Sequence, residues 1–158
     1  MAKAAPNISP KNSPENSLGV LWTPQQKIPG ALGSVYRGIK ATDDGFAGFG
    51  EAYFSTVKHA AVKGWKFHHQ MTCNLIVAVG QIEVAVFDEK LTQHQLYSLG
   101  EANYGRLTLP PRVWFAFRGA GKELNLVLNV ASIAHDPAES SAAALDDARF
   151  ANVQWTQS

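Results

Sequence analysis

Residues 73–88 read CNLIVAVGQIEVAVFD, which is two apolar runs joined by Gly80-Gln81. In the second run Ile82, Val84 and Val86 alternate with other residues, a period that is typical of a strand with one buried face. A glycine between two such runs is a usual place for a tight connection. The stretch therefore predicts two consecutive β-strands.

Similar short segments recur along the chain, separated by Gly, Pro and Asp. We expect strands at Gly33–Ile39, Gly50–Lys58, Ala61–His69, Cys73–Val79, Ile82–Asp88, Tyr104–Leu109, Val113–Arg118 and Leu124–Ala131. Strands at this spacing predict an all-β sandwich or barrel. The exception is Pro137–Phe150, where a run of alanines predicts a short C-terminal helix.

The two ends of the chain differ in composition. Residues 1–18 are expected to be a disordered tail, because the first 17 carry three Pro, three Asn and three Ser. Residues 19–158 are expected to form a single domain, since the whole length of 158 residues is typical of one. Neither a secretory signal nor a membrane span is visible, so we expect a cytoplasmic protein without a membrane partner.

The charge balance excludes one class of partner. The chain has 14 Lys and Arg against 13 Asp and Glu, a formal net charge of +1. A protein that holds a phosphate backbone needs a much larger excess of positive charge. We therefore expect no nucleic acid as a partner.

Side chains that could act in catalysis or binding are most concentrated in residues 62–70, VKGWKFHHQ. In a strand Lys66 and His68 share one face, and the aromatic side chains share the other. In one interpretation the aromatic face is core and the basic face meets water. In the other, Lys66 and His68 line a pocket, where histidine moves protons and lysine stabilises a developing oxyanion.

Metal and nucleophile chemistry have little support. His68 and His69 are adjacent, so in a strand they point to opposite faces and do not chelate one ion together. Cys73 lies among apolar residues, as a buried and unreactive thiol would. No phosphate-binding loop or nucleophile elbow is present. We expect no metal and no cofactor.

Residues 99–117, LGEANYGRLTLPPRVWFAF, resemble without a gap the Leu-Ser-x-x-Asn-x-x-x-Leu-x-Ile-Pro-Pro-Gly-x-x-His-Gly-Phe segment of dTDP-4-dehydrorhamnose 3,5-epimerases. Residues 62–66, 80–88 and 135–147 are similar to three further motifs of these enzymes, in the same order. The family consists of cupins, whose fold is a jelly-roll or double-stranded β-helix. The resemblance implies this fold, a homodimer and a nucleotide-sugar substrate.

The same resemblance shows which family side chains are replaced. The family's catalytic base, a histidine, falls on Lys66; a second histidine falls on Phe115; and the tyrosine acid falls on Asn129. His68, two residues along the same strand face as Lys66, is the nearby imidazole that can act as the base. Lys66 would then stabilise the enolate oxygen.

The remaining site residues follow from the chemistry that such a reaction needs. Return of the proton to a neighbouring carbon gives a ketoisomerase, whereas return on the opposite face needs a second group, for which Tyr104 and His135 are candidates. Lys63 takes the place of a family arginine and is expected to meet a diphosphate. The other expected substrate-binding residues are Asn74, Arg106, Arg112, Asn129 and His135.

These observations predict an isomerase or epimerase that acts by proton transfer next to the keto group of a nucleotide-activated 4-keto-6-deoxy sugar. Such a reaction belongs to the synthesis of cell-surface polysaccharides or deoxysugars. The alternative is a cupin that binds a sugar or nucleotide sugar without turning it over. A homodimer is also expected because Trp65, Phe67, Trp114 and Trp155 suggest an apolar surface that a partner would cover.

Overall fold

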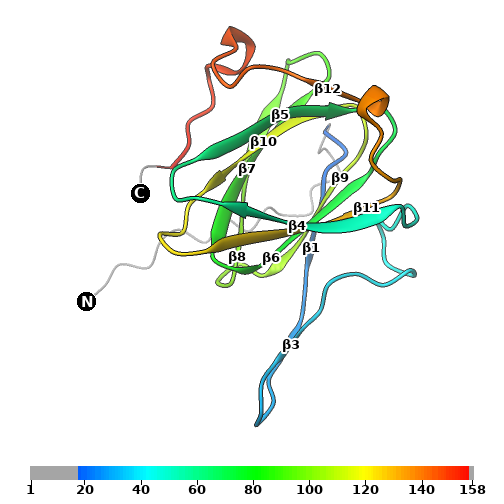
Figure 1. Ribbon diagram of the computed structural model, residues 1–158, viewed down its shortest axis with the longest axis vertical. Coiled ribbons are helices and arrows are strands. Elements are labelled where there is room, and N and C mark those ends of the chain that lie inside the picture. The colour runs from blue at the N-terminus through cyan, green and yellow to red at the C-terminus, as the bar shows by residue number, and fades with distance from the viewer. Residues whose placement is uncertain (1–17, 157–158) are drawn as a thin grey trace.

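The computed structural model describes residues 18–156, which are almost entirely β-strand and loop (Figure 1). The strands are β1 (Leu21–Pro24), β2 (Lys27–Ile28), β3 (Val35–Tyr36), β4 (Glu51–Val57), β5 (Val62–His68), β6 (Cys73–Val79), β7 (Gln81–Asp88), β8 (His94–Gly100), β9 (Gly105–Leu109), β10 (Val113–Gly119), β11 (Asn125–Ala131) and β12 (Ser140–Ala142). The all-β prediction is confirmed, and each of the eight expected ranges overlaps a strand.

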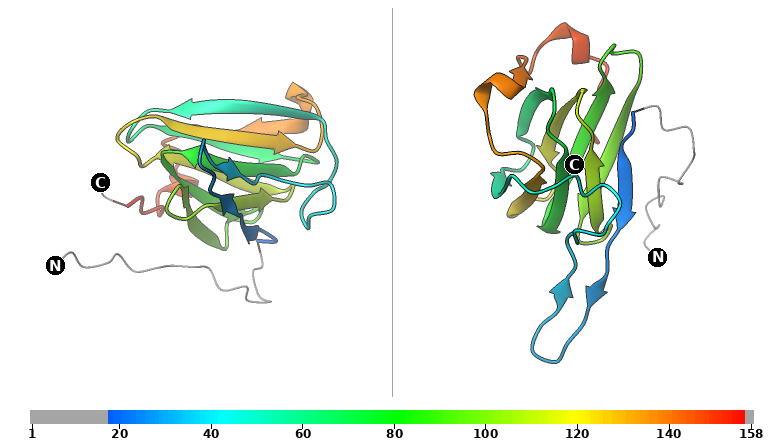
Figure 2. Two further views of the ribbon diagram at one scale, coloured as in Figure 1. Left: turned by 90° about the horizontal axis from the view of Figure 1, so that it is seen from below. Right: turned by 90° about the vertical axis from the view of Figure 1, so that its right-hand side faces the viewer.

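Two five-stranded antiparallel sheets face each other (Figures 1 and 2). The first sheet has the order β1-β9-β6-β11-β4, and the second has the order β12-β5-β10-β7-β8. Ile82, Val84 and Val86, whose alternation predicted β7, are fully buried in the main apolar core. Gly80 makes the β6–β7 turn with a φ of +80°, a left-handed conformation that favours glycine.

Strands β1, β8 and β12 were not predicted from the sequence, and all three are edge strands. An edge strand pairs with a neighbour on one side only and is less often covered on both faces. It therefore carries fewer apolar residues, as the sequence HQLYSLG of β8 illustrates. The short β2 was missed as well, and it pairs only with β3.

The predicted C-terminal helix is replaced by two single turns of 3₁₀ helix, η1 (Pro137–Glu139) and η2 (Ala148–Phe150), with β12 between them. Strand β12 pairs with β5, so that Ser140 lies opposite His68. The backbone groups that a helix would have bonded internally are used in this sheet pairing instead.

The outer face of the second sheet carries a second apolar cluster. Trp65, only 3% exposed, stacks on Phe150 of η2 with ring centroids 4.0 Å apart. Trp114 and Trp155 pack against the same cluster, and Phe67 is buried. The C-terminal segment of the same chain thus packs on these aromatic residues. The inference of an open aromatic surface is wrong, and the homodimer stays a prediction.

Two further features lie at the margins of the sheets. The β2–β3 hairpin projects away from the body of the molecule (Figure 2), and Leu32 in its loop is fully exposed.

Leu18 is buried in the main core, so the ordered domain begins before Gly19; the rest of the predicted tail lies outside the described residues. No helix among residues 18–156 is long and apolar enough to cross a membrane.

Candidate active site

A cavity of about 260 Å³ lies between the two sheets. Its walls combine apolar side chains with several polar and charged ones, which is typical of a site for a small polar ligand. The residues that line it are Tyr53, Ser55, Lys63, Gly64, Lys66, His68, Leu75, Phe115, Phe117, Val127, Asn129, His135 and Ser140.

Strand β5 directs its basic side chains into this cavity. Lys66 and His68 both line it, whereas Trp65 is buried in the cluster on the other side of the sheet. Lys63 lines the cavity too, because the β5–β10 register shifts between Phe115 and Ala116 and places one extra residue on β5. Of the two interpretations of the basic face, the structure therefore favours the pocket.

His68 is paired with a buried carboxylate. Its Nδ1 lies 2.7 Å from Oε2 of Glu139, and the two side chains are 12% and 7% exposed. The other carboxylate oxygen, Oε1, accepts hydrogen bonds from the backbone N–H of Gln70 at 2.7 Å and of Met71 at 2.8 Å. His68 at the end of β5 and the backbone of the two residues Gln70 and Met71 beyond it thus hold the Glu139 carboxylate at three points.

These contacts decide the charge on the carboxylate and the tautomer of the imidazole. Burial alone would raise the pKa of Glu139, but the hydrogen bonds from the Gln70 and Met71 backbone and from His68 outweigh it and lower the pKa. The ionised carboxylate holds a proton on Nδ1 of His68. Nε2 is then the nitrogen that can accept a proton, and no described residue hydrogen-bonds to it.

Glu139 was not predicted to be a site residue. The available signal was its place in the motif of residues 135–147 that carries part of the family resemblance. Proximity to His68 was not visible, because 71 residues separate the two along the chain.

The first sheet contributes a second polar pair. Asn129 on β11 lies directly opposite Tyr53 on β4, and its Nδ2 donates to the Tyr53 hydroxyl at 3.0 Å. Asn129 is 4% exposed, and its Oδ1 has no partner among the described residues. Burial raises the pKa of Tyr53, and the hydrogen bond from Asn129 offsets part of that rise. Tyr53 was missed because no motif marks it.

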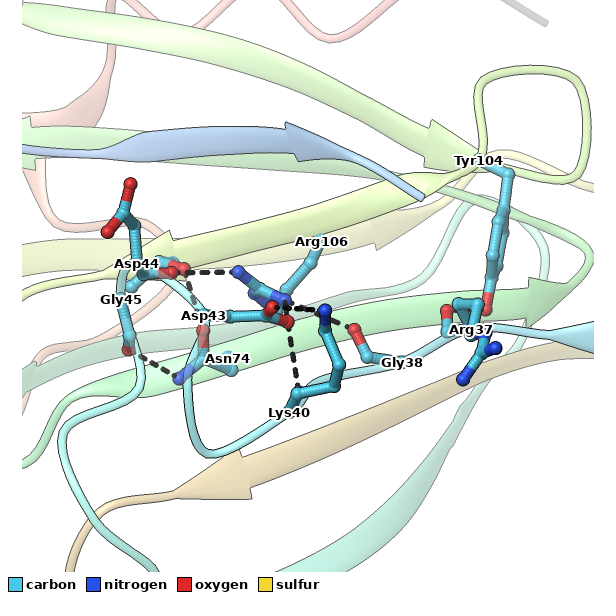
Figure 3. Close-up of polar contacts among 10 residues, drawn as sticks. Arg37, Gly38, Lys40, Asp43, Asp44, Gly45, Asn74, Tyr104 and Arg106 are labelled. Carbon is cyan, nitrogen blue, oxygen red and sulfur yellow. Dashed lines mark hydrogen bonds and ion pairs between the residues drawn. The ribbon is translucent and has the colours of Figure 1, made fainter. Parts of the chain in front are cut away.

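Tyr104 and Arg106 do not line the cavity, which corrects the roles expected for them. Figure 3 shows the contacts that they make instead. The hydroxyl of Tyr104 donates to the backbone carbonyl of Arg37 at 2.8 Å. The buried guanidinium of Arg106 donates to the carboxylate of Asp43 at 3.0 Å and to the carbonyls of Gly38 and Asp44. These side chains hold the loop before β4 against the body instead of facing a substrate.

Asn74 and Arg112 are likewise outside the cavity. Asn74 donates to the carbonyl of Gly45 at 3.1 Å and accepts from Thr108, so both its polar groups are used within the fold. Arg112 is exposed and forms a bidentate ion pair with Glu89. The predicted site residues that do line the cavity are Lys63, Lys66, His68, Asn129 and His135.

Metal ligands do not gather in the described part of the chain, where no three His, Cys, Asp or Glu side chains form a group that could hold an ion. His69 faces away from His68 and contacts Ser141 through Nε2 at 3.2 Å. Burial raises the pKa of Cys73 to about 12, which makes this thiol a poor nucleophile. The expectation of no metal and no cofactor stays a prediction.

Solved structures provide the comparison with known proteins, because no protein-family model and no curated protein matches the chain. A dTDP sugar isomerase from Desulfovibrio desulfuricans is 34% identical, with a TM-score of 0.80, over 87% of this chain and 90% of that one. A sugar 3,4-ketoisomerase from Thermoanaerobacterium thermosaccharolyticum, in complex with TDP, is 17% identical, with a TM-score of 0.67, over 77% and 86%. A 4-keto-6-deoxy sugar epimerase from the novobiocin gene cluster of Streptomyces spheroides is 14% identical, with a TM-score of 0.76, over 88% and 75%. The last two show a shared fold.

Proposed function

The chain belongs to the family of dTDP-sugar isomerase and epimerase cupins, and we propose that it moves a proton at the carbon next to the keto group of a nucleotide-activated 4-keto-6-deoxy sugar. The observation that carries the proposal is the pairing of His68 with Glu139 at the wall of the cavity. With its Nδ1 proton held by a carboxylate, a neutral imidazole keeps Nε2 available as the proton acceptor, the arrangement of a general base.

The first step uses groups of β5 alone. Nε2 of His68 takes the proton from the carbon beside the ketone; the electron pair of that C–H bond forms the C=C bond of an enolate, and the π pair of the C=O bond moves onto the oxygen. The ammonium group of Lys66, which shares the strand face with His68, stabilises the enolate oxygen. The Nδ1–H group of His68 donates a short hydrogen bond to the carboxylate of Glu139, and this bond keeps the proton on the imidazole.

Lys63 is the side chain of the cavity wall that we expect to bind the nucleotide portion of the substrate. Lys63 is exposed and lines the same cavity as Lys66, so it can contact a diphosphate at the opening. Its point charge suits an anion whose orientation is set by other contacts.

We also propose that the two sheets form the jelly-roll expected of a cupin. The support is a nested order of pairs, in which β7 pairs with β8, β6 with β9, β5 with β10 and β4 with β11. Each successive pair lies on the opposite sheet from the one before. A long hairpin that is wound in this way places β4 and β5 on opposite sides of one interior.

The test is solvent deuterium exchange into dTDP-4-keto-6-deoxyglucose, followed by NMR. The wild-type protein is expected to incorporate deuterium at C3 or C5. The variant His68→Asn is expected to lose at least about 100-fold of that rate, the usual contribution of a positioned base.

His69→Asn is the matched control, because it removes the neighbouring imidazole from the opposite face of the strand. It is expected to retain the wild-type rate. Equal rates in His68→Asn and wild type would contradict the proposal. Line broadening of the sugar signals without any incorporation by the wild-type protein would favour a binding protein instead.

A further inference from the structure

The cavity has polar groups on two opposite walls. His68 belongs to β5 of the second sheet and Tyr53 to β4 of the first, and both line the same cavity (Figure 1 shows the two strands). A sugar enolate held between the sheets would present one face of its planar carbon to each wall. Proton removal on one side can therefore be followed by proton delivery from the other.

The hydroxyl of Tyr53 is arranged as a donor. Nδ2 of Asn129 donates to its oxygen, so the proton of the phenol is not used in that hydrogen bond. No described residue accepts this proton within hydrogen-bond distance. The same Asn129 N–H would stabilise the phenolate that remains after donation. A phenol is protonated near neutral pH, and the partial burial of Tyr53 raises its pKa further.

Other donors on the cavity wall are less well placed. Lys63 and Lys66 lie on β5 itself, so they share the sheet of His68. His135 lines the cavity but is exposed and has no hydrogen bond to a described residue that would orient it. The phenol of Tyr104, the other candidate from the sequence, is bonded to Arg37 outside the cavity.

We propose that Tyr53 is a catalytic acid that delivers a proton to the face of the carbon opposite His68, so that this chain is an epimerase; the inference rests on the proposed function. The O–H bond of Tyr53 breaks as a new C–H bond forms on the far face, and the electrons of the enolate return to the C=O bond. His68 leaves the step protonated and Tyr53 ionised. Exchange with water returns both to their starting states.

The test compares Tyr53→Phe with wild type in D₂O, and NMR reports two quantities separately: deuterium incorporation into the sugar and formation of the inverted sugar. Tyr53→Phe is expected to lose at least about 100-fold in inverted product, within the range of general acid catalysis. Deuterium incorporation with retained configuration is expected to continue, because His68 can exchange its proton with solvent and return deuterium to the same face. Loss of both signals in Tyr53→Phe, without loss of thermal stability, would overturn the separate role.

Tyr104→Phe is the matched control and is expected to form inverted product at the wild-type rate, since that phenol lies outside the cavity. Formation of inverted product by Tyr53→Phe at the wild-type rate would overturn the proposal. Loss of inverted product in His135→Asn instead would identify His135 as the acid. Wild-type deuterium incorporation with a shifted keto group and no inverted product would overturn the role of Tyr53 but leave the proposed function intact. A wild-type protein that incorporates no deuterium would overturn both.

Discussion

Replacing Glu139 by glutamine removes one negative charge and leaves the shape of the side chain unchanged. The amide oxygen can still accept from the backbone N–H groups of Gln70 and Met71. The amide nitrogen then faces Nδ1 of His68 as a donor, so the imidazole must carry its proton on Nε2 instead. In that tautomer Nε2 of His68 carries a proton and has no lone pair that could accept one from the substrate.

The expected loss of stability follows from the hydrogen bonds. A hydrogen bond to a charged group contributes about 1.5–3 kcal/mol and a neutral one about 0.5–1.5, so the two backbone bonds to Glu139 together lose about 2 kcal/mol in Glu139→Gln. For a domain of this size that lowers the melting temperature by about 4–8 °C. The wrong tautomer of a catalytic histidine lowers turnover by up to about 10⁴-fold, and we expect a loss of about 10²–10⁴ in deuterium exchange.

The stability difference should depend on pH with a defined sign. The pKa of Glu139 is lower in the folded protein than in the unfolded chain, so its stabilising contribution is complete above the unfolded pKa and is lost as the pH falls through the folded pKa. Thermal denaturation followed by circular dichroism should therefore show a large gap between wild type and Glu139→Gln at pH 7. The gap should narrow below pH of about 4, where the unfolded carboxyl is protonated.

Glu89→Gln is the control, because Glu89 forms an exposed ion pair with Arg112 and should change stability by less than about 0.5 kcal/mol. The reasoning about Glu139 would be refuted if Glu139→Gln melted within 1 °C of wild type, on a scale where about 2–4 °C corresponds to 1 kcal/mol. Exchange of deuterium at the wild-type rate by a folded Glu139→Gln protein would refute the tautomer argument separately.

Two further predictions concern buried groups outside the cavity. Arg106→Met should lower the free energy of unfolding, measured with urea, by about 3 kcal/mol, because it removes the buried guanidinium that donates to two carbonyls of the 38–45 loop and to the carboxylate of Asp43, which then keeps its contacts with Lys40. Arg112→Met, at an exposed ion pair, should change it by less than about 0.5 kcal/mol, and equal effects of the two variants would contradict the assignment of Arg106. Cys73, whose pKa burial raises to about 12, should not react with a disulfide reagent at pH 8 in the native protein and should react on unfolding; rapid native labelling would show that it is accessible.

Much of the site on β5 could be predicted from the sequence. The two-residue period of a strand places Lys66 and His68 on one face whatever the rest of the fold does, and both do line the cavity. The entry of Lys63 could not be predicted in this way, because it depends on a bulge in the pairing of β5 with β10. A bulge changes the period locally, and the residues on β5 alone do not reveal it.

The partners of these residues could not be predicted. Glu139 reaches His68 because β12 pairs with β5 and brings η1 beside the end of that strand. Tyr53 faces the cavity because β4 pairs with β11, where Asn129 lies opposite it. Tyr104 and Arg106 lie within the motif of residues 99–117 and were expected in the site, but their side chains hydrogen-bond to the segment before β4. A linear motif specifies neither the face of a strand nor the loop that packs on it.

The sequence by itself determined the β-strands with two-residue periods, the common face of Lys66 and His68, and the family, because these depend on local geometry and on motif order. Tertiary structure alone decided which carboxylate orients His68, which phenol lines the same cavity, and where the aromatic residues are buried. Those contacts join segments far apart in the chain, and they depend on which strands are neighbours in each sheet. The positions of β8 and β12 were decided in the same way, because an edge strand is defined by its neighbour more than by its own composition.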